Sequence, residues 1–558
     1  MLARRPTRRG ERGTIARREE SSYSPDEVKP ATREETLPVA LAAILLATIA
    51  LVVSYSRGYM LLYGDAVAHL GIARRIIDSR YPGLSQLGGV WLPLPHLLMV
   101  PFVQRMDWWQ SGLAGAWPSL FCYIVGAMGF YRLVRRMVTR RWSFAATAFY
   151  LLNPNLLYLS TTAMTEALFL AILVWTTLLT MEYVQAVRDG RASVATRRML
   201  LLGLLVMAAV FTRYDGWILG AAVWCVVSWQ LYRHREHVVK LRAAYMVFTV
   251  LCVAGPLLWL GYNQHFYGDP LDFMRGPYSA AAIEKRTTAP GAKHYPGWHD
   301  PLWALVLYTR VAQLDAAVWE TGFVVMAAAL WGLVVSVRRR LEPAWLLLWI
   351  PLPFYVYSIA FGSVPLFIPP FEPHSYYNSR YGMEMLPALV AGTFVALDWL
   401  WRRVSMVQPL VARLLYPVSL SLAALNCVGM MHWQPLVLKE AMVNSTTRIA
   451  FESAVARVMN GFPRGVPIMM YTSDHIGAVQ QAGRPLKEMV SELDRDSWKI
   501  ALEAPADHAA YVIAVAGDPV AKAVEEHPQG LTELTVLCTT GQSCARIYQS
   551  DRFSPISH

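Results

Sequence analysis

Charged residues are scarce in this chain of 558 residues. Only 16% of the residues are Asp, Glu, Lys or Arg, whereas 55% are hydrophobic. Soluble globular domains carry about 25% charged residues, so this scarcity excludes an ordinary soluble protein. Several apolar runs also reach the roughly 20 residues that a helix needs to cross a bilayer. The chain is therefore expected to be an integral membrane protein.

Common nucleotide and metal motifs are missing as well. The sequence contains no P-loop, no HExxH and no set of cysteines with zinc-site spacing. No metal ligands and no resident cofactor are assigned, and a requirement for a divalent metal stays open. The net charge of +12 does not indicate a nucleic-acid partner, because the basic residues form short clusters between apolar runs.

Cysteine is rare, and six residues in a chain of this length exclude a disulfide framework. Four of them lie in apolar segments, where cysteine acts as a small hydrophobic residue. The other two, Cys538 and Cys544, flank a short turn near the C-terminus. Outside the cytoplasm they can form a disulfide that closes a small loop, and two unpaired thiols are the alternative.

The first 36 residues are rich in Arg, Glu, Ser and Pro and lack apolar periodicity. Residues 1–36 are therefore predicted to be a disordered cytoplasmic tail. The apolar run that follows, Leu37–Tyr55, is too long for the core of a cleaved signal peptide and lacks a cleavage site. It is predicted to be the first membrane span.

Arginine clusters alternate with the apolar runs along the chain, and this alternation predicts about eleven spans. Every connection that it places in the cytoplasm carries an arginine cluster, which is the usual determinant of topology. The predicted spans are 37–55, 110–131, a third ending at Asn153, 164–184, 199–212, a sixth ending at Arg233, 243–262, an eighth ending at Arg338, 343–361, 382–401 and 410–431. The N-terminus is then cytoplasmic, and the protein is a multi-pass protein of the cell membrane, specifically a bacterial inner membrane.

Long connections gather on the side that is predicted to lie outside. They are residues 58–95, 263–314 and 362–381. Long ordered loops on one face of a scaffold commonly carry function, so the site is expected there. From residue 433 to 558, apolar runs of strand length alternate with helical patterns. This segment is predicted to be a small extracytoplasmic α/β domain, attached to a transmembrane domain of residues 37–432.

The first of these loops contains a pattern typical of an amphipathic helix lying along the membrane surface. From Asp65 to Ile77, apolar residues recur at steps of three and four. Asp65 lies in the first turn, where helix amides stabilise a carboxylate, and His69 lies one turn further on the same face. A proline-stiffened stretch that contains His96 then returns toward the bilayer. A plain capping role for Asp65 is an equally good interpretation.

Three more ionisable residues lie at ends of predicted spans. Glu166 is placed near the outer end of the fourth span, where a carboxylate normally faces a cavity or a partner. Arg380 opens the tenth span and Arg213 ends the fifth, and arginine can bind a phosphate with two hydrogen bonds. The structural alternatives are an interfacial carboxylate and local ion pairs. Those pairs would be Arg380 with Glu384 and Arg213 with Asp215.

These residues together resemble the GT-C membrane glycosyltransferases, and most closely glycosyltransferase family 39, the group of protein O-mannosyltransferases and aminoarabinose transferases. The matching features are Asp65 in an outward first loop, a surface helix, a proline-rich re-entry, Glu166, and Arg380-Tyr381 opening a late span. The resemblance covers residues 37 to about 432, and the C-terminal domain is similar to the variable periplasmic module of such enzymes. The sequence departs from the family at Ala66, where Glu is frequent, and at the re-entry.

The resemblance implies a GT-C fold and transfer, with inversion, of a mannose-like or other monosaccharide from a polyprenyl-phosphate carrier. The acceptor would be an extracytoplasmic glycan, lipid or protein. Asp65 would be the catalytic carboxylate, Glu166 a second active-site acid, and Arg380 a ligand of the lipid phosphate. The remaining candidates are Tyr381 and Arg213 beside the donor, and His69, His96, Arg275, His374 and Asn378 along the acceptor or substrate site.

Two other classes of function also fit the sequence. A polytopic transporter or lipid flippase fits the spans and the charged residues within them, but transporters tend to show internal repeats, and none is evident. A non-catalytic membrane partner in envelope assembly is the third class, and a dispensable Asp65 would favour it. The expected partners are membrane lipids and a polyprenyl-phosphate sugar.

Overall fold

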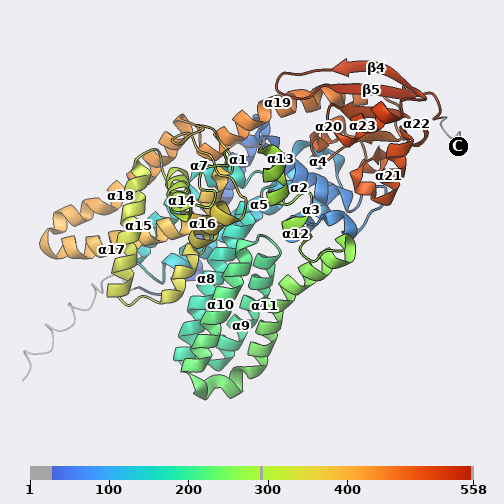
Figure 1. The fold of residues 1–558 in the computed structure, drawn as a ribbon. Helices are drawn as coiled ribbons and strands as arrows, with labels where there is room; N and C mark the ends of the chain where they lie inside the picture. The colour runs from blue at the N-terminus through green and yellow to red at the C-terminus, as the bar shows by residue number, and fades with distance from the viewer. Residues whose placement is uncertain (1–27, 289–292, 554–558) are drawn as a thin grey trace, which may run out of the picture.

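The computed structural model describes residues 28–288 and 293–553, and its fold is largely helical (Figure 1). The predicted disordered tail covers residues 1–36, and residues 1–27 of it lie outside the described residues. Residues 33–36 are helical rather than disordered, because α1 begins at Arg33 behind a capping box formed by Thr32 and Glu35.

Nine segments within the described residues are long and apolar enough to cross a membrane. They are α1 (Arg33–Ser56), α5 (Leu113–Val134), α8 (Glu166–Arg188), α9 (Ala192–Val210), η3 with α11 (Arg235–His237, Val238–Tyr267), α15 (Thr321–Arg338), η4 with α16 (Pro343–Trp349, Pro351–Phe361), η5 with α17 (Ser379–Met385, Leu386–Val407), and α18 with α19 (Pro409–His432, Leu436–Met459). In the most apolar 18-residue stretch of α8, 89% of the residues are buried, so this helix forms the centre of the bundle. The predicted class, a polytopic α-helical membrane protein, is confirmed.

Two of the eleven predicted spans are not among these nine. α6 (Arg140–Leu151) has only 12 residues, and α10 (Asp215–Arg233) is long enough but less apolar than the others. α9 begins at Ala192, seven residues before the predicted start of the fifth span, and is therefore long enough to cross. Every predicted span coincides with a helix, and the number of crossings stays a prediction.

The sequence predicts an α/β domain over residues 433–558. Its strands and helices are present and span residues 468–550, which form the C-terminal domain. Its sheet has the order β2-β1-β3-β5-β4, with β1, β2 and β3 parallel and β5 antiparallel to both of its neighbours. The strands are β1 (Ile468–Met470), β2 (Met489–Val490), β3 (Tyr511–Val515), β4 (Leu531–Leu537) and β5 (Ala545–Ser550). The helices are α20 (Ile476–Ala482), η6 (Leu486–Glu488), η7 (Glu492–Asp494), α21 (Asp496–Glu503), α22 (Pro505–His508) and α23 (Pro519–Glu526). Cys538 and Cys544 form a disulfide between β4 and β5.

Shorter helices fill the connections between the long helices. They are η1 (Tyr59–Leu61), α2 (Gly64–Arg75), η2 (Leu84–Leu87), α3 (Leu94–Val103), α4 (Met106–Ser111), α7 (Pro154–Leu159), α12 (Asp272–Arg275), α13 (Ala280–Thr287) and α14 (Pro301–Ala316). α2 is the helix predicted from the amphipathic pattern, but it packs against both α3 and α20. A Cβ atom on Gly71 would lie 3.0 Å from the side chain of Ile476. The C-terminal domain therefore packs on α2, and the prediction that α2 lies along the membrane surface stays a prediction.

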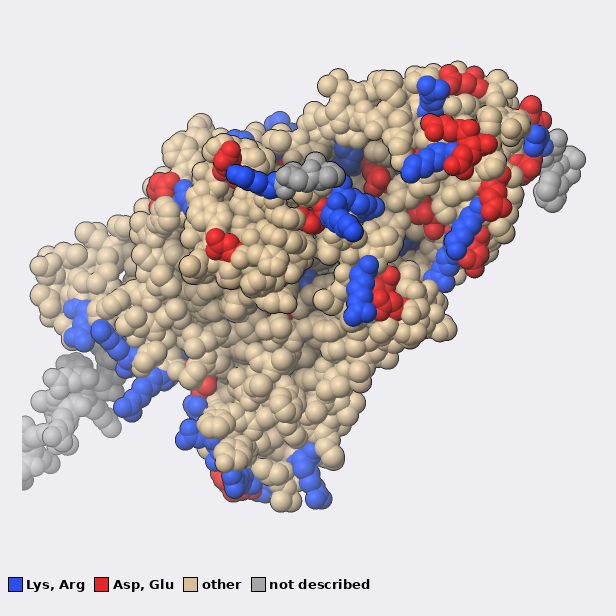
Figure 2. All heavy atoms as spheres, viewed as in Figure 1, with Lys and Arg blue, Asp and Glu red and all other residues tan. Residues whose placement is uncertain are grey.

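Charged side chains are unevenly distributed over the surface. On the face shown in Figure 2, Lys and Arg gather at the helix ends farthest from the C-terminal domain. Acidic and basic residues cover the C-terminal domain itself, and a broad band with few charged residues separates the two regions. This distribution fits a bundle that crosses a bilayer.

Candidate active site

Asp65 lies in the first turn of α2, and its carboxylate is 2.5 Å from Nη2 of Arg380. Its side chain is 40% exposed. The chain just before it is fixed from α19, where Arg448 donates hydrogen bonds of 3.0 Å to the carbonyl oxygens of Leu61 and Leu62. Asp65 is therefore an anchored carboxylate that a substrate can reach.

Arg380 lies in η5 and connects carboxylates from distant parts of the chain. Its side chain is 8% exposed, with Nε 3.1 Å from Glu166 and Nη1 3.9 Å from Glu440. The alternative ion pair with Glu384 is absent among the contacts of Arg380. The reason is local geometry, because η5 is a 3-10 helix, in which residues four apart do not lie above one another as they do in an α-helix.

Arg213 lies between α9 and α10 and is the second cation of the site. It is 2.9 Å from Glu384, 3.4 Å from Glu166 and 3.5 Å from Asp215. Its Nη2 atom also donates to the hydroxyl of Tyr355 at 2.5 Å, and that hydroxyl donates to Glu384 at 2.8 Å. The predicted local pair with Asp215 is present, but Glu166 joins Arg213 to Arg380 in one network.

Aromatic rings cover both guanidinium groups. The ring of Tyr381 lies 4.9 Å from the guanidinium carbon of Arg380 and 5.3 Å from that of Arg213. Tyr63 covers Arg380 at 5.3 Å, and Tyr355 stacks on Tyr381 at 4.9 Å. Such rings attract cations and fix the plane of a guanidinium group. The two arginines are therefore held in defined orientations.

Carboxylates outnumber cations in this cluster. Two arginines face five carboxylates, those of Asp65, Glu166, Asp215, Glu384 and Glu440. An anion that enters therefore competes with these carboxylates for the two guanidinium groups. In the part of the chain that the structure describes, no group of three or more His, Cys, Asp or Glu residues could hold a metal ion.

A histidine pair lies beside the cluster. Nδ1 of His69 and Nε2 of His96 are 2.8 Å apart, and the ring of Trp91 packs on His69 at 4.4 Å. Burial lowers the pKa of His69 to about 4, although the negative charge of Asp65 acts in the opposite direction. His69 is therefore neutral near pH 7 and is suited to hydrogen bonding rather than to binding an anion.

The side chains of three other predicted site residues make no ion pair or hydrogen bond with the site residues that the structure describes. Arg275 is largely exposed, with its nearest carboxylate, Asp269, 3.9 Å away. His374 is exposed, and its Nδ1 atom is 2.7 Å from the carbonyl oxygen of Pro369. Asn378 is adjacent to the cluster, but its side chain donates to a backbone carbonyl group, 2.9 Å away, and so does not face the arginines.

Sequence reasoning missed two partners in the site. Tyr355 and Glu440 contact the arginines, yet they lie far along the chain from Asp65. Glu440 falls in a segment that was assigned to a separate domain, whereas α19 carries it into the bundle. The one local signal was a carboxylate inside a helical, largely apolar pattern, which also fits an ordinary surface helix.

Asp315, at the end of α14, is a buried carboxyl group outside this network. Its side chain is fully buried, and neither of its oxygens has a hydrogen-bond partner. It lies under η5, where a Cβ atom on Gly382 would approach one carboxyl oxygen to 2.7 Å. A buried polar group without partners costs free energy, and the cost is larger when it is charged.

We expect Asp315→Asn to stabilise the protein, by about 1 kcal/mol or more, because a neutral amide replaces an acid that has no partner. The measurement is the thermal unfolding midpoint in one detergent. Asp398→Asn is the matched control, since Asp398 is equally buried but lies 2.8 Å from Arg339 and 3.0 Å from Arg402, and this variant should be less stable. An equal loss of stability in both variants would contradict the interpretation of Asp315.

Only the comparison with solved structures finds proteins that match this chain. No family model matches the chain, and no curated protein matches it. The crystal structure of ArnT from Cupriavidus metallidurans bound to undecaprenyl phosphate is similar with a TM-score of 0.57 and 14% identity, over 94% of this chain and 100% of that one. The apo structure of the same protein gives a TM-score of 0.56 and 16% identity, over 92% and 99%. The chain therefore has the same fold as ArnT.

Proposed function

We propose that this chain is an inverting membrane glycosyltransferase that takes a monosaccharide from a polyprenyl-phosphate carrier. The observation that carries the proposal is the contact of one buried guanidinium, that of Arg380, with both Asp65 and Glu166. The fold supports the proposal, as does the similar structure of ArnT with undecaprenyl phosphate bound. The acceptor is a glycan, lipid or protein on the side of the C-terminal domain.

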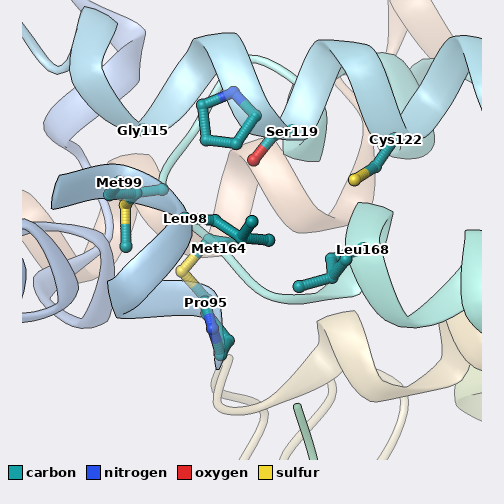
Figure 3. Close-up of a pocket in the computed structure, with 10 residues that line it drawn as sticks. Pro95, Leu98, Met99, Gly115, Ser119, Cys122, Met164 and Leu168 are labelled. Atoms are coloured by element: carbon teal, nitrogen blue, oxygen red, sulfur yellow. The ribbon is translucent and has the colours of Figure 1, made fainter. Parts of the chain in front are cut away.

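An apolar pocket beside the cluster is suited to the start of a lipid chain (Figure 3). It is lined from α3 by Pro95, Leu98 and Met99, from α5 by Gly115, Pro118, Ser119 and Cys122, and from the chain that leads into α8 and its first turn by Ala163, Met164 and Leu168. Glu166 lies within this last stretch of chain. The cavity is small, about 20 Å³, which is room for about one water molecule, so side chains must move before a lipid chain can enter.

The reaction places two demands on the site. The oxygen of an acceptor hydroxyl forms a bond to C1 of the sugar while the bond from C1 to the phosphate oxygen breaks, and its electron pair leaves with the polyprenyl phosphate. The acceptor proton needs a base, and Asp65 is the accessible carboxylate. The leaving phosphate needs positive charge, which Arg380 and Arg213 supply.

Binding of the polyprenyl-phosphate donor can release Asp65 from Arg380. In the protein alone, Arg380 holds Asp65 at 2.5 Å. A phosphate that binds Arg380 at Nη2 competes with that carboxylate for the same nitrogen. Donor binding then leaves Asp65 without its cation and available to the acceptor.

The test is an assay of the purified protein with a panel of polyprenyl-phosphate monosaccharides, with and without EDTA, and with membrane extracts as the source of acceptor. We expect one donor to be consumed, with release of polyprenyl phosphate and the opposite anomeric configuration in the product. Movement of the lipid-linked sugar across vesicles without cleavage of its C1–O bond would instead support a flippase and contradict the proposal.

The topology can be tested separately. We propose that the N-terminus and the loops at 132–141, 188–198, 233–242, 338–342 and 402–409 are cytoplasmic and that residues 433–558 are outside. Ile500 is exposed on the C-terminal domain, so Ile500→Cys should react with a membrane-impermeant maleimide added to the outside of intact cells. Subtracting the labelling of the parent protein corrects for its own cysteines. Labelling from the cytoplasmic side alone would reverse the topology.

A further inference from the structure

We propose that Glu440 is a positioning residue that fixes Arg380 relative to Asp65, so that α19 forms part of the active site. The proposal rests on the function proposed above. Glu440 is 2% exposed, and its carboxylate contacts three consecutive residues of another segment. It accepts hydrogen bonds from the backbone N–H of Asn378 at 3.0 Å and of Ser379 at 2.7 Å, and from the hydroxyl of Ser379.

The position of these amides explains why a carboxylate is needed. Asn378 precedes η5 with a left-handed backbone (φ 58°, ψ 23°), and its side chain does not cap the helix. The first N–H groups of a helix have no partner within the helix, and a negative charge at this end is favourable. Glu440 supplies both the acceptors and the charge. Arg380 is the next residue, so the placement of this turn sets the origin of its side chain.

α19 is in turn fixed against the segment that carries Asp65. The backbone N–H of Val437 donates to the side chain of Asn155 at 3.0 Å. The hydroxyl of Tyr63, two residues before Asp65, donates to the carbonyl oxygen of Val437 at 3.0 Å. One turn of α19 thus contacts both the segment before Asp65 and the turn before Arg380. We infer that it sets the distance between the two charged groups.

Glu440→Gln tests this role because the side chain keeps its shape and loses its charge and one acceptor. In hydrogen–deuterium exchange of the full-length protein, peptides covering residues 374–385 should exchange at least 10-fold faster, while α17, which follows them, exchanges as before. Glu488→Gln is the matched control. Glu488 also accepts a backbone N–H, that of Gly465 at 3.1 Å, and lies 3.1 Å from Arg484, but in the C-terminal domain.

Binding and turnover give a second, independent readout. In Glu440→Gln, turnover of the donor should fall on the order of 10- to 100-fold, because a small misplacement of a catalytic group has such effects. Binding of undecaprenyl phosphate should fall much less than turnover, since the negative charge removed beside Arg380 offsets part of the effect of its misplacement. Glu488→Gln should match the parent in both measurements.

Two results would overturn the proposal. One is unchanged exchange at residues 374–385. The other is a parallel loss of lipid binding and turnover in Glu440→Gln, which is the pattern of a structural defect. If the parent protein turns over no polyprenyl-phosphate sugar, the proposed function fails, but exchange at residues 374–385 still decides whether Glu440 positions this turn.

Discussion

Asp65→Asn should lower sugar transfer by about 10²- to 10⁴-fold, the range that general-base assistance typically provides. Asn has almost the same shape as Asp but does not accept the proton of the acceptor hydroxyl. The substitution also weakens the contact with Arg380, which is 2.5 Å away, and so releases a cation for the donor phosphate. We therefore expect undecaprenyl phosphate to bind at least as tightly as it does to the parent. Single-turnover transfer and direct lipid binding measure the two effects.

Two further variants are compared with Asp65→Asn. Glu166→Gln should lower transfer less than Asp65→Asn, because the carboxylate of Glu166 is fully buried between two arginines and does not reach an acceptor. Asp78→Asn is the matched control, since Asp78 is also paired with an arginine in the same loop, 2.7 Å from Arg74, and should leave transfer unchanged. Near-normal transfer by folded Asp65→Asn would remove the catalytic assignment.

Arg380→Ala should abolish transfer and also destabilise the fold. The sequence suggests only a loss of donor affinity, but in the structure Arg380 is the shared cation of Asp65, Glu166 and Glu440. Removing one partner of a buried ion pair costs about 3–5 kcal/mol, because the remaining charge is uncompensated. The free energy of unfolding should therefore fall together with activity, and this variant alone does not isolate donor binding.

Arg380→Lys separates the two effects. Lysine keeps the charge but not the planar set of donors. We expect a folded protein whose affinity for undecaprenyl phosphate falls by about 1.5–3 kcal/mol, the range for a hydrogen bond to a charged group. Arg339→Lys, at an ion pair with Asp398 outside the network of Arg380 and Arg213, is the control and should bind the lipid normally. Parent-like lipid binding by Arg380→Lys would exclude Arg380 as the phosphate ligand.

The positions of the helices were predictable because long apolar runs and arginine clusters are strong signals. α1 and α8 follow the predicted spans within a few residues. Weaker elements were not predictable. β2 has two residues, and β5, with the sequence ARIYQS, has no apolar run, so neither stands out from its surroundings. Their existence depends on pairing with β1 and β3.

The candidate site was predictable where a charge interrupts an apolar segment. Glu166 and Arg380 stand out for this reason, since such placements are costly without a partner. Their partners were not predictable, because contacts such as that between Arg380 and Glu440 depend on how distant segments pack.

The most direct test of the central claim is an experimental structure of the protein with undecaprenyl phosphate bound. The account predicts a phosphate oxygen at about 3 Å from a nitrogen of Arg380, with Asp65 displaced from Nη2. It also predicts that the lipid chain starts between α3, α5 and the beginning of α8. A phosphate bound elsewhere, with Arg380 still closed on Asp65 and Glu166, would contradict it.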